Sequence, residues 1–222
     1  MNINQYIDHT LLKPTATITD IIALCNEAKT HKFHAICVNS CYVALAKAEL
    51  KDSAIKVCSV IGFPLGAMST EAKVEEAKQA LKDGADEIDM VINIGFLKSK
   101  DFDAVWKDIE AVKKTITHTV LKVIIETCYL DTIEIIKASE LAINSGADYI
   151  KTSTGFGSKG TTIEAVQLIK GVINNCEVKI KASGGIRDTK TALEYINLGV
   201  SRIGTSNGVA IVTNTLNNTN NY

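Results

Sequence analysis

Lys151 is the residue of this sequence with the clearest potential for a chemical reaction, because it lies in the middle of a strand-like stretch. Its neighbours Tyr149, Ile150 and Thr152 are aromatic or β-branched, which suits a pleated strand. A buried ammonium group is costly unless it pairs with a carboxylate or gives up its proton. A neutral lysine amine is a nucleophile for carbonyl carbon. Judged from this strand alone, a structural lysine in a buried ion pair is the more frequent case.

Charged residues also lie in three other strand-like stretches, each shortly before the stretch ends: Asp89, Lys122 and Lys181. Side chains alternate along a strand and neighbouring strands are about 4.8 Å apart, so residues of matching parity can share a barrel interior. Burial and a neighbouring ammonium would both lower the pKa of a lysine and favour the nucleophilic amine. Asp89 could instead neutralise a buried lysine, and we expect Lys122 to be its structural partner rather than a catalyst. Ionisable groups are costly to gather in one interior without a use, so the set favours a catalytic site.

Glycine-bearing turns follow the last three strand-like stretches. They contain Gly155, Gly184 with Gly185, and Gly204 with Ser206. Bare backbone NH groups at such turns and at helix N-termini form cradles for phosphate, commonly after the last two strands of a barrel. One such turn is weak evidence, since glycine also simply makes turns. Three on adjacent strands indicate a small phosphorylated substrate.

The elements that must position these residues alternate between strand and helix along the chain. Apolar, β-branched runs predict strands at 6–12, 35–39, 56–62, 87–93, 121–127, 149–154, 178–183 and 202–206. Periodic apolar faces and capping residues predict helices at 17–32, 40–50, 69–82, 102–115, 131–144, 161–174 and 188–198. A final short helix and a polar tail, frayed from about 212 to 222, complete the prediction.

Alternating apolar strands and helices predict an α/β protein with a parallel sheet, either closed or open. The first strand, at 6–12, has the weakest pattern, but it brings the number of strand–helix units to eight. Eight units, and the lack of a GxGxxG turn after an early strand, favour a TIM (β/α)8 barrel over a doubly wound sheet. We therefore predict one TIM-barrel domain over residues 1–222.

Composition argues against several classes of function. The chain has a net charge of −1 and no basic block, so we expect no nucleic-acid or anionic-membrane partner. It has no apolar run of membrane-spanning length and no signal-peptide pattern at its start, so we expect a cytoplasmic protein. The 6 cysteines include no CxxC pair, and Cys37 suits a small buried apolar position. The 4 histidines lack metal-ligand spacing, so a dedicated zinc site has weak support. We expect no metal and no other cofactor.

Several longer motifs are characteristic of one family. They are the runs at 6–14 (YIDHTLLKP), 37–39 (CVN), 60–66 (VIGFPLG), 86–93 (DEIDMVIN), 122–127 (KVIIET), 149–156 (YIKTSTGF) and 181–187 (KASGGIR). The KTSTG and KASGG runs, in that order, are highly specific. On these motifs the chain resembles the deoxyribose-phosphate aldolases, a family of class I aldolases, over nearly its whole length.

This resemblance implies a metal-independent TIM barrel that reversibly cleaves 2-deoxy-D-ribose 5-phosphate to D-glyceraldehyde 3-phosphate and acetaldehyde, in deoxyribonucleotide catabolism. It implies that Lys151 forms the Schiff base and that Asp89 and Lys181 transfer protons. Strand spacing alone does not choose between the two lysines as nucleophile. A homo-oligomer is compatible with the resemblance. Supporting positions are assigned to Lys122, Thr152 and Cys37.

The sequence departs from the family pattern at Ser40, Ser158, Lys159 and Asn207. These departures affect the geometry of the phosphate loops and leave the chemistry intact. Two other functions stay open. One is another phosphate-binding barrel, such as an isomerase or synthase, whose lysines act only electrostatically. The other is a metabolite-binding barrel without turnover, which an activity assay would distinguish.

Overall fold

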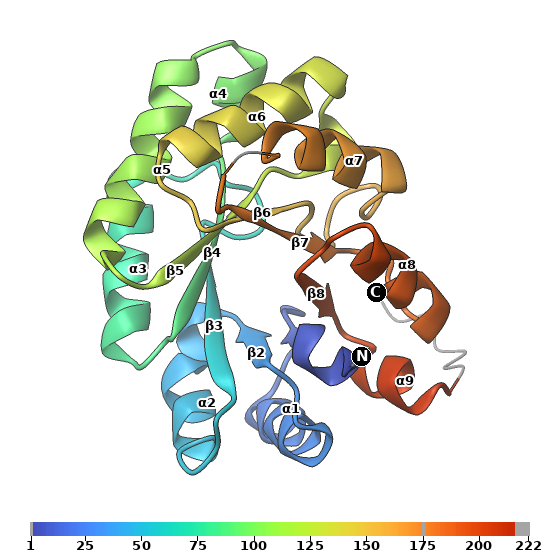
Figure 1. The fold of residues 1–222 in the computed structure, drawn as a ribbon. Coiled ribbons are helices and arrows are strands. Elements are labelled where there is room, and N and C mark those ends of the chain that lie inside the picture. Colours follow the sequence, from blue (N-terminus) through green and yellow to red (C-terminus); the bar gives the residue numbers. More distant parts are fainter. Residues whose placement is uncertain (1, 175, 216–222) are drawn as a thin grey trace.

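The protein forms a closed barrel of parallel strands with helices around its outside, as the computed structural model shows (Figure 1). The structure describes residues 2–174 and 176–215. The strands are β1 (Ile7–Leu11), β2 (Ala35–Val38), β3 (Lys56–Ile61), β4 (Glu87–Val91), β5 (Val120–Ile124), β6 (Tyr149–Lys151), β7 (Lys179–Ser183) and β8 (Arg202–Thr205). The helices are α1 (Ile18–His31), α2 (Val43–Glu49), α3 (Thr70–Lys82), α4 (Ile94–Lys98), α5 (Phe102–Ile116), α6 (Thr132–Asn144), α7 (Ile163–Val172), α8 (Thr189–Asn197) and α9 (Gly208–Thr213).

Each strand pairs in parallel with the next one in the sequence, and β8 pairs with β1 to close the barrel. The weakly patterned first strand is therefore confirmed, with Ile7 opposite Ile203 and His9 opposite Thr205. This closure confirms the predicted TIM barrel and excludes the doubly wound sheet.

Side-chain caps determine where several helices begin. Asp131 accepts a hydrogen bond from the backbone NH of Glu134, whose side chain accepts from the backbone NH of Asp131, so α6 begins with a capping box. Thr162, rather than Thr161, caps α7, which ends at Val172 instead of continuing to 174.

Several segments differ from the predicted elements. The strands predicted to reach 127 and 154 end earlier, β5 at Ile124 and β6 at Lys151. The helix predicted from 40 begins as a separate 3₁₀ helix, Ser40–Tyr42, before α2. The loop expected after β4 contains the short helix α4, capped by Asn93, whose side chain accepts from the backbone NH of Phe96. A helix of five residues is too short to show apolar periodicity in a sequence. The polar tail expected from 212 begins inside α9, which ends at Thr213. The remainder of that tail, 216–222, lies outside the described residues.

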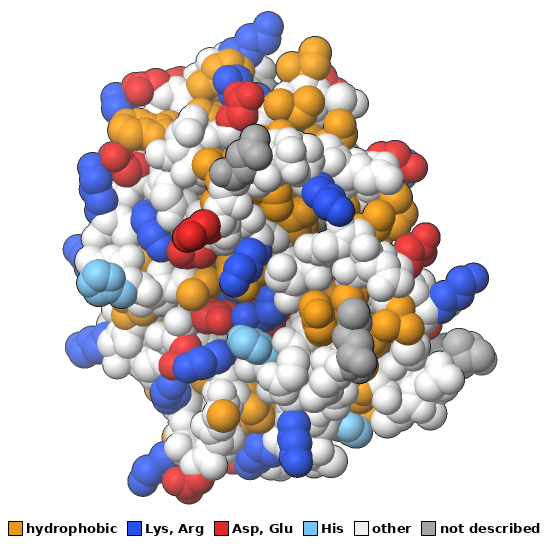
Figure 2. Space-filling view, viewed as in Figure 1, with side chains coloured by type: hydrophobic (Ala, Val, Ile, Leu, Met, Phe, Trp, Pro, Cys, Tyr) orange, Lys and Arg blue, Asp and Glu red, His pale blue; other side chains and the backbone are white. Residues whose placement is uncertain are grey.

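The apolar core lies between the barrel wall and the helices. Ile88 and Met90 of β4 are buried in one cluster with Ile109 and Val112 of α5. The interior of a TIM barrel is usually filled by branched aliphatic side chains. Here charged side chains of several strands are buried instead. On the surface, lysine or arginine, acidic and histidine side chains lie over the middle of the molecule (Figure 2). No helix in the described part of the chain is long and apolar enough to cross a membrane.

Candidate active site

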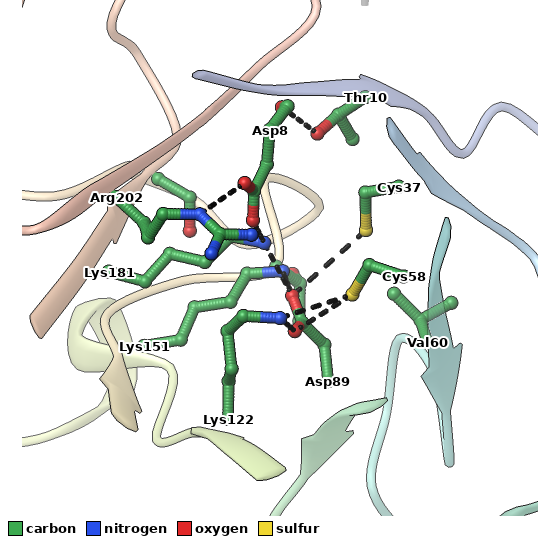
Figure 3. Close-up of polar contacts among 12 residues, drawn as sticks. Asp8, Thr10, Cys37, Cys58, Val60, Asp89, Lys122, Lys151, Lys181 and Arg202 are labelled. Carbon is green, nitrogen blue, oxygen red and sulfur yellow. Dashed lines mark hydrogen bonds and ion pairs between the residues drawn. The ribbon is translucent and has the colours of Figure 1, made fainter. Parts of the chain in front are cut away.

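Asp89 lies at the centre of a fully buried group of side chains inside the barrel (Figure 3). Its Oδ2 atom lies 2.7 Å from the Nζ atoms of both Lys151 and Lys181. Its Oδ1 atom lies 2.8 Å from the Nζ atom of Lys122. The structure thus brings together all four ionisable residues that the sequence singled out, one from each of β4 to β7.

The register sets the level of each lysine along the barrel axis. Lys151 and Lys181 are opposite each other on β6 and β7, as Asp89 and Lys122 are on β4 and β5. Lys151 is opposite Ile124, two residues beyond Lys122. Lys122 therefore lies closer to the amino ends of the strands, which agrees with its expected part as a structural partner of Asp89.

Three further charged residues extend this group, and the sequence analysis missed all of them. Asp8 of β1 lies 2.5 Å from the Nζ atom of Lys181 and 2.6 Å from the Nε atom of Arg202. Arg202 also donates to both carboxylate oxygens of Glu87, at 2.7 and 3.2 Å. Glu87 in turn lies 2.7 Å from the Nζ atom of Lys122. For Glu87, the sequence did offer a signal in the alternation of side chains along a strand. Glu87 precedes Asp89 by two residues and so shares its face of the strand.

The network keeps Asp89 as a carboxylate and Lys181 as an ammonium ion. Burial acts to raise the pKa of Asp89, but the three lysines around it outweigh burial and hold the pKa well below its usual range. Burial acts to lower the pKa of Lys181, but Asp8 and Asp89 outweigh burial and raise it. The expectation that burial and neighbouring ammonium groups lower a lysine pKa here is therefore wrong for Lys181, because two carboxylates contact it directly.

The buried network holds one more basic side chain than it holds carboxylates. Leaving Lys151 aside, the carboxylates of Asp8, Glu87 and Asp89 are matched by the cations of Lys122, Lys181 and Arg202. A neutral Lys151 amine leaves this buried group without net charge, whereas a protonated one adds a positive charge.

Two thiols complete the surroundings of Asp89. Cys58 donates to the Oδ1 atom of Asp89 at 3.0 Å, and Cys37, opposite Cys58 on β2, is fully buried as expected. Within the described residues, these three side chains have ligand atoms close enough to share a metal ion. The ammonium groups already paired with Asp89 would repel such an ion, so the group suits proton chemistry better than metal binding.

The predicted phosphate turns lie at the carboxyl ends of the last strands. Gly155, Gly184 and Gly185 have φ angles of 90°, 84° and 81°, a region that favours glycine. A Cβ atom on Gly160 would lie 2.2 Å from the carbonyl oxygen of Gly184. The loops after β6 and β7 therefore pack directly against each other through glycine backbone.

The other predicted residues lie close by but make different contacts. A Cβ atom on Gly204 would lie 3.1 Å from the Cε atom of Lys181, so this glycine gives the lysine its space. Thr152 accepts from the backbone NH of Ser183 at 3.0 Å and thereby joins the ends of β6 and β7. Ser206 lines a cavity of about 410 Å³ that α1 also lines.

Comparison with known proteins identifies the family to which the chain belongs. Residues 3–218 match the family described as DeoC/LacD family aldolase. A curated deoxyribose-phosphate aldolase from Treponema denticola is 53% identical over 215 residues, which cover 96% of this chain and 99% of that protein. One from Thermococcus gammatolerans is 57% identical and covers 96% of each chain. The tetrameric deoxyribose phosphate aldolase from Aeropyrum pernix superposes with a TM-score of 0.88 at 33% identity, covering 95% of this chain and 89% of that one. The chain therefore belongs to the DeoC/LacD family of aldolases, and within it to the deoxyribose-phosphate aldolases.

Proposed function

We propose that this aldolase reversibly cleaves 2-deoxy-D-ribose 5-phosphate to D-glyceraldehyde 3-phosphate and acetaldehyde through a Schiff base on Lys151, in deoxyribonucleotide breakdown. The observation that carries the proposal is the position of the Lys151 amine. It is buried, and it lies 2.7 Å from the Asp89 oxygen that also holds the Lys181 ammonium group. A nucleophile, a proton donor and a carboxylate thus converge on one point.

The chemistry follows from the electron sink that an iminium ion provides. The neutral Lys151 amine attacks C1 of the open-chain sugar, and the carbinolamine loses water to give the iminium ion. When the C3 hydroxyl gives up its proton, the C2–C3 bond breaks and its electron pair moves onto the iminium to form an enamine. D-Glyceraldehyde 3-phosphate leaves with the former C3 as its aldehyde carbon. Protonation of the enamine at C2, followed by hydrolysis, releases acetaldehyde and restores the amine.

The directions of the pKa shifts divide the proton-transfer roles. Lys181 suits the proton donor, because its raised pKa keeps a proton available for the departing hydroxyl and for the enamine carbon. Asp89 suits an acceptor rather than a donor, because its lowered pKa keeps it ionised. We assign to Asp89 the orientation of both amines and the acceptance of the C3 hydroxyl proton through a bridging water.

Borohydride reduction in the presence of acetaldehyde, followed by peptide mass mapping, tests this proposal. We expect an ethyl group on Lys151, its loss in Lys151→Met, and its retention in Lys181→Met with turnover abolished. A label on Lys181 instead would reverse the two roles. Turnover without any label would support a barrel whose lysines act electrostatically, and neither label nor turnover would support a binding protein.

We also propose that backbone NH groups at Gly155, Gly184 and Gly185, together with Ser206, receive the phosphate of the substrate. Their support is the positive φ of the three glycines and the position of all four residues after the last strands. The unphosphorylated sugar should then show a higher KM. An unchanged KM would mean that the protein makes no favourable contact with the phosphate and would contradict this proposal.

A homo-oligomer is proposed as the assembly of this chain. The relative from Aeropyrum pernix is tetrameric, and apolar side chains of this chain stand exposed, with Leu65 at 74% and Ile133 at 77%. Light scattering after size-exclusion chromatography would test it, and a monomer at micromolar concentration would contradict it. A cytoplasmic location fits the proposed substrate, because the charge on a sugar phosphate prevents it from crossing a membrane unaided.

A further inference from the structure

We propose that Glu126 is a positioning residue that fixes the loop after Lys151 in the shape that receives the phosphate-bearing end of the substrate. The inference rests on the proposed function and deepens it. No sequence pattern singled out Glu126 for a role, since it forms the end of an apolar run. Its carboxylate instead contacts the loop that follows the adjacent strand.

Glu126 is held in an unusual backbone conformation, between β5 and the 3₁₀ helix Thr127–Tyr129. Its φ is 54°, in the left-handed region that residues other than glycine seldom occupy. The side chain is only 2% exposed. A buried carboxyl group is costly without hydrogen-bond donors. Such a residue therefore needs donors whose hydrogen bonds offset the free-energy cost of both burial and backbone strain.

Thr154 supplies those partners, three residues after Lys151. The backbone NH of Thr154 lies 3.1 Å and 3.3 Å from the two carboxylate oxygens, and its hydroxyl donates to Oε2. The same hydroxyl oxygen accepts from the backbone NH of Phe156 at 3.0 Å. The carboxylate thus orders the first turn of the loop directly and, through Thr154, one residue further.

The far side of this turn also rests on Glu126. A Cβ atom on Gly157 would lie 2.5 Å from the Sγ atom of Cys128 and 3.3 Å from the Cδ atom of Glu126. The backbone at 157 therefore passes directly over the carboxyl group. Behind it, the backbone NH of Ile125 donates to the carbonyl of Lys151 at 3.1 Å, which joins the base of the loop to the same segment.

Charge is consistent with a place beside an anion-binding loop. Burial raises the pKa of Glu126 and outweighs the hydrogen bonds from Thr154 and the charge of Lys151, which act to lower it. A carboxyl group that holds its proton more readily repels a nearby phosphate less. Its hydrogen bonds are also directed at the loop rather than toward the barrel axis, where the reaction takes place.

The test compares paired variants on two sugars, 2-deoxyribose 5-phosphate and unphosphorylated 2-deoxyribose. Glu126→Ala removes the acceptor for two donors, so KM for the phosphorylated sugar should rise about tenfold or more while kcat changes little. Glu126→Gln keeps an oxygen that can accept from Thr154 and should restore most of the KM. KM for the unphosphorylated sugar should stay the same in both variants.

Thr154 and Glu76 provide matched controls. Thr154→Val should reproduce the KM increase and Thr154→Ser should not, which keeps the test valid if Glu126→Ala does not fold. Glu76 accepts from the backbone NH of Gly62 at 2.8 Å on another loop, so Glu76→Gln should leave the phosphate preference unchanged. An equal loss on both sugars, an unchanged KM, or no rescue by Glu126→Gln would overturn the inference. Acetaldehyde trapping on Lys151 should persist throughout, and its absence from the unsubstituted protein would refute the proposed function instead.

Discussion

Replacement of Lys122 by methionine would test whether this lysine is structural, as the sequence and the structure both indicate. Lys122 is fully buried and its Nζ atom lies 2.8 Å from Asp89 and 2.7 Å from Glu87. Removing one partner of a buried ion pair costs about 3–5 kcal/mol. Each carboxylate keeps another cation, Lys181 for Asp89 and Arg202 for Glu87. We therefore expect the lower end of that range, a loss of about 3 kcal/mol in the free energy of unfolding.

Urea denaturation measures this loss, and Lys107→Met serves as its control. Lys107 pairs with Asp103 at 2.6 Å, but both side chains are largely exposed, so the control should unfold almost as the unsubstituted protein does. For a chain of this length, about 3 kcal/mol corresponds to a fall in Tm of roughly 6–12 °C. Acetaldehyde trapping on Lys151 should persist in Lys122→Met at a temperature where the variant is folded.

Two results would refute this reasoning. If Lys122→Met unfolds like Lys107→Met, the buried ion pairs do not stabilise the barrel. If the variant keeps its stability but loses trapping, Lys122 takes part in forming the imine and is not a purely structural residue.

Three other outcomes follow from the same geometry. Gly204→Ala should keep the fold but lower kcat by about tenfold or more, because a Cβ atom 3.1 Å from the Cε atom of Lys181 displaces that side chain; an unchanged kcat would contradict this. The pKa values of Asp8 and Asp89 are lowered in the folded state, so their contribution to stability is present above pH ~4 and lost as pH falls through the lowered values. Arg202→Met removes a cation that lowers the pKa of Asp8, so acid unfolding followed by circular dichroism should occur at a higher pH, and an unshifted midpoint would argue against the linkage. EDTA should leave activity unchanged, and activity lost to EDTA and restored by a divalent ion would refute the metal-free mechanism.

The barrel and the central residues could be predicted because both depend on local patterns. Eight apolar runs separated by amphipathic helices leave few arrangements, and the strand parity of Asp89, Lys122, Lys151 and Lys181 places them on one face. The sequence did not predict that Lys181 stays protonated. That outcome depends on Asp8, which is 173 residues away in the chain (181 − 8) and meets Lys181 only through barrel closure.

Short elements and close contacts could not be predicted for a different physical reason. The five residues of α4 carry too little periodicity to distinguish a helix from a loop. Gly204 leaves space for Lys181 of the neighbouring strand, since a Cβ atom at 204 would lie 3.1 Å from the Cε atom of that lysine. No pattern within one strand encodes such a distance. The contact between Glu126 and Thr154 likewise joins the segments that follow two different strands, β5 and β6, and the two residues are 28 positions apart.

The pairing of Asp8 with Arg202 has a consequence for the order in which the chain is synthesised. The two residues are 194 positions apart, and the other cation that contacts Asp8 is Lys181. Before the ribosome has added Lys181 and Arg202, β1 has neither its β8 neighbour nor the cations that neutralise its aspartate. Burying that carboxylate early would be costly, so the edge of β1 stays in water until the C-terminal residues emerge. β1 precedes the other strands of the barrel in the sequence, yet it is therefore among the last to take its final place.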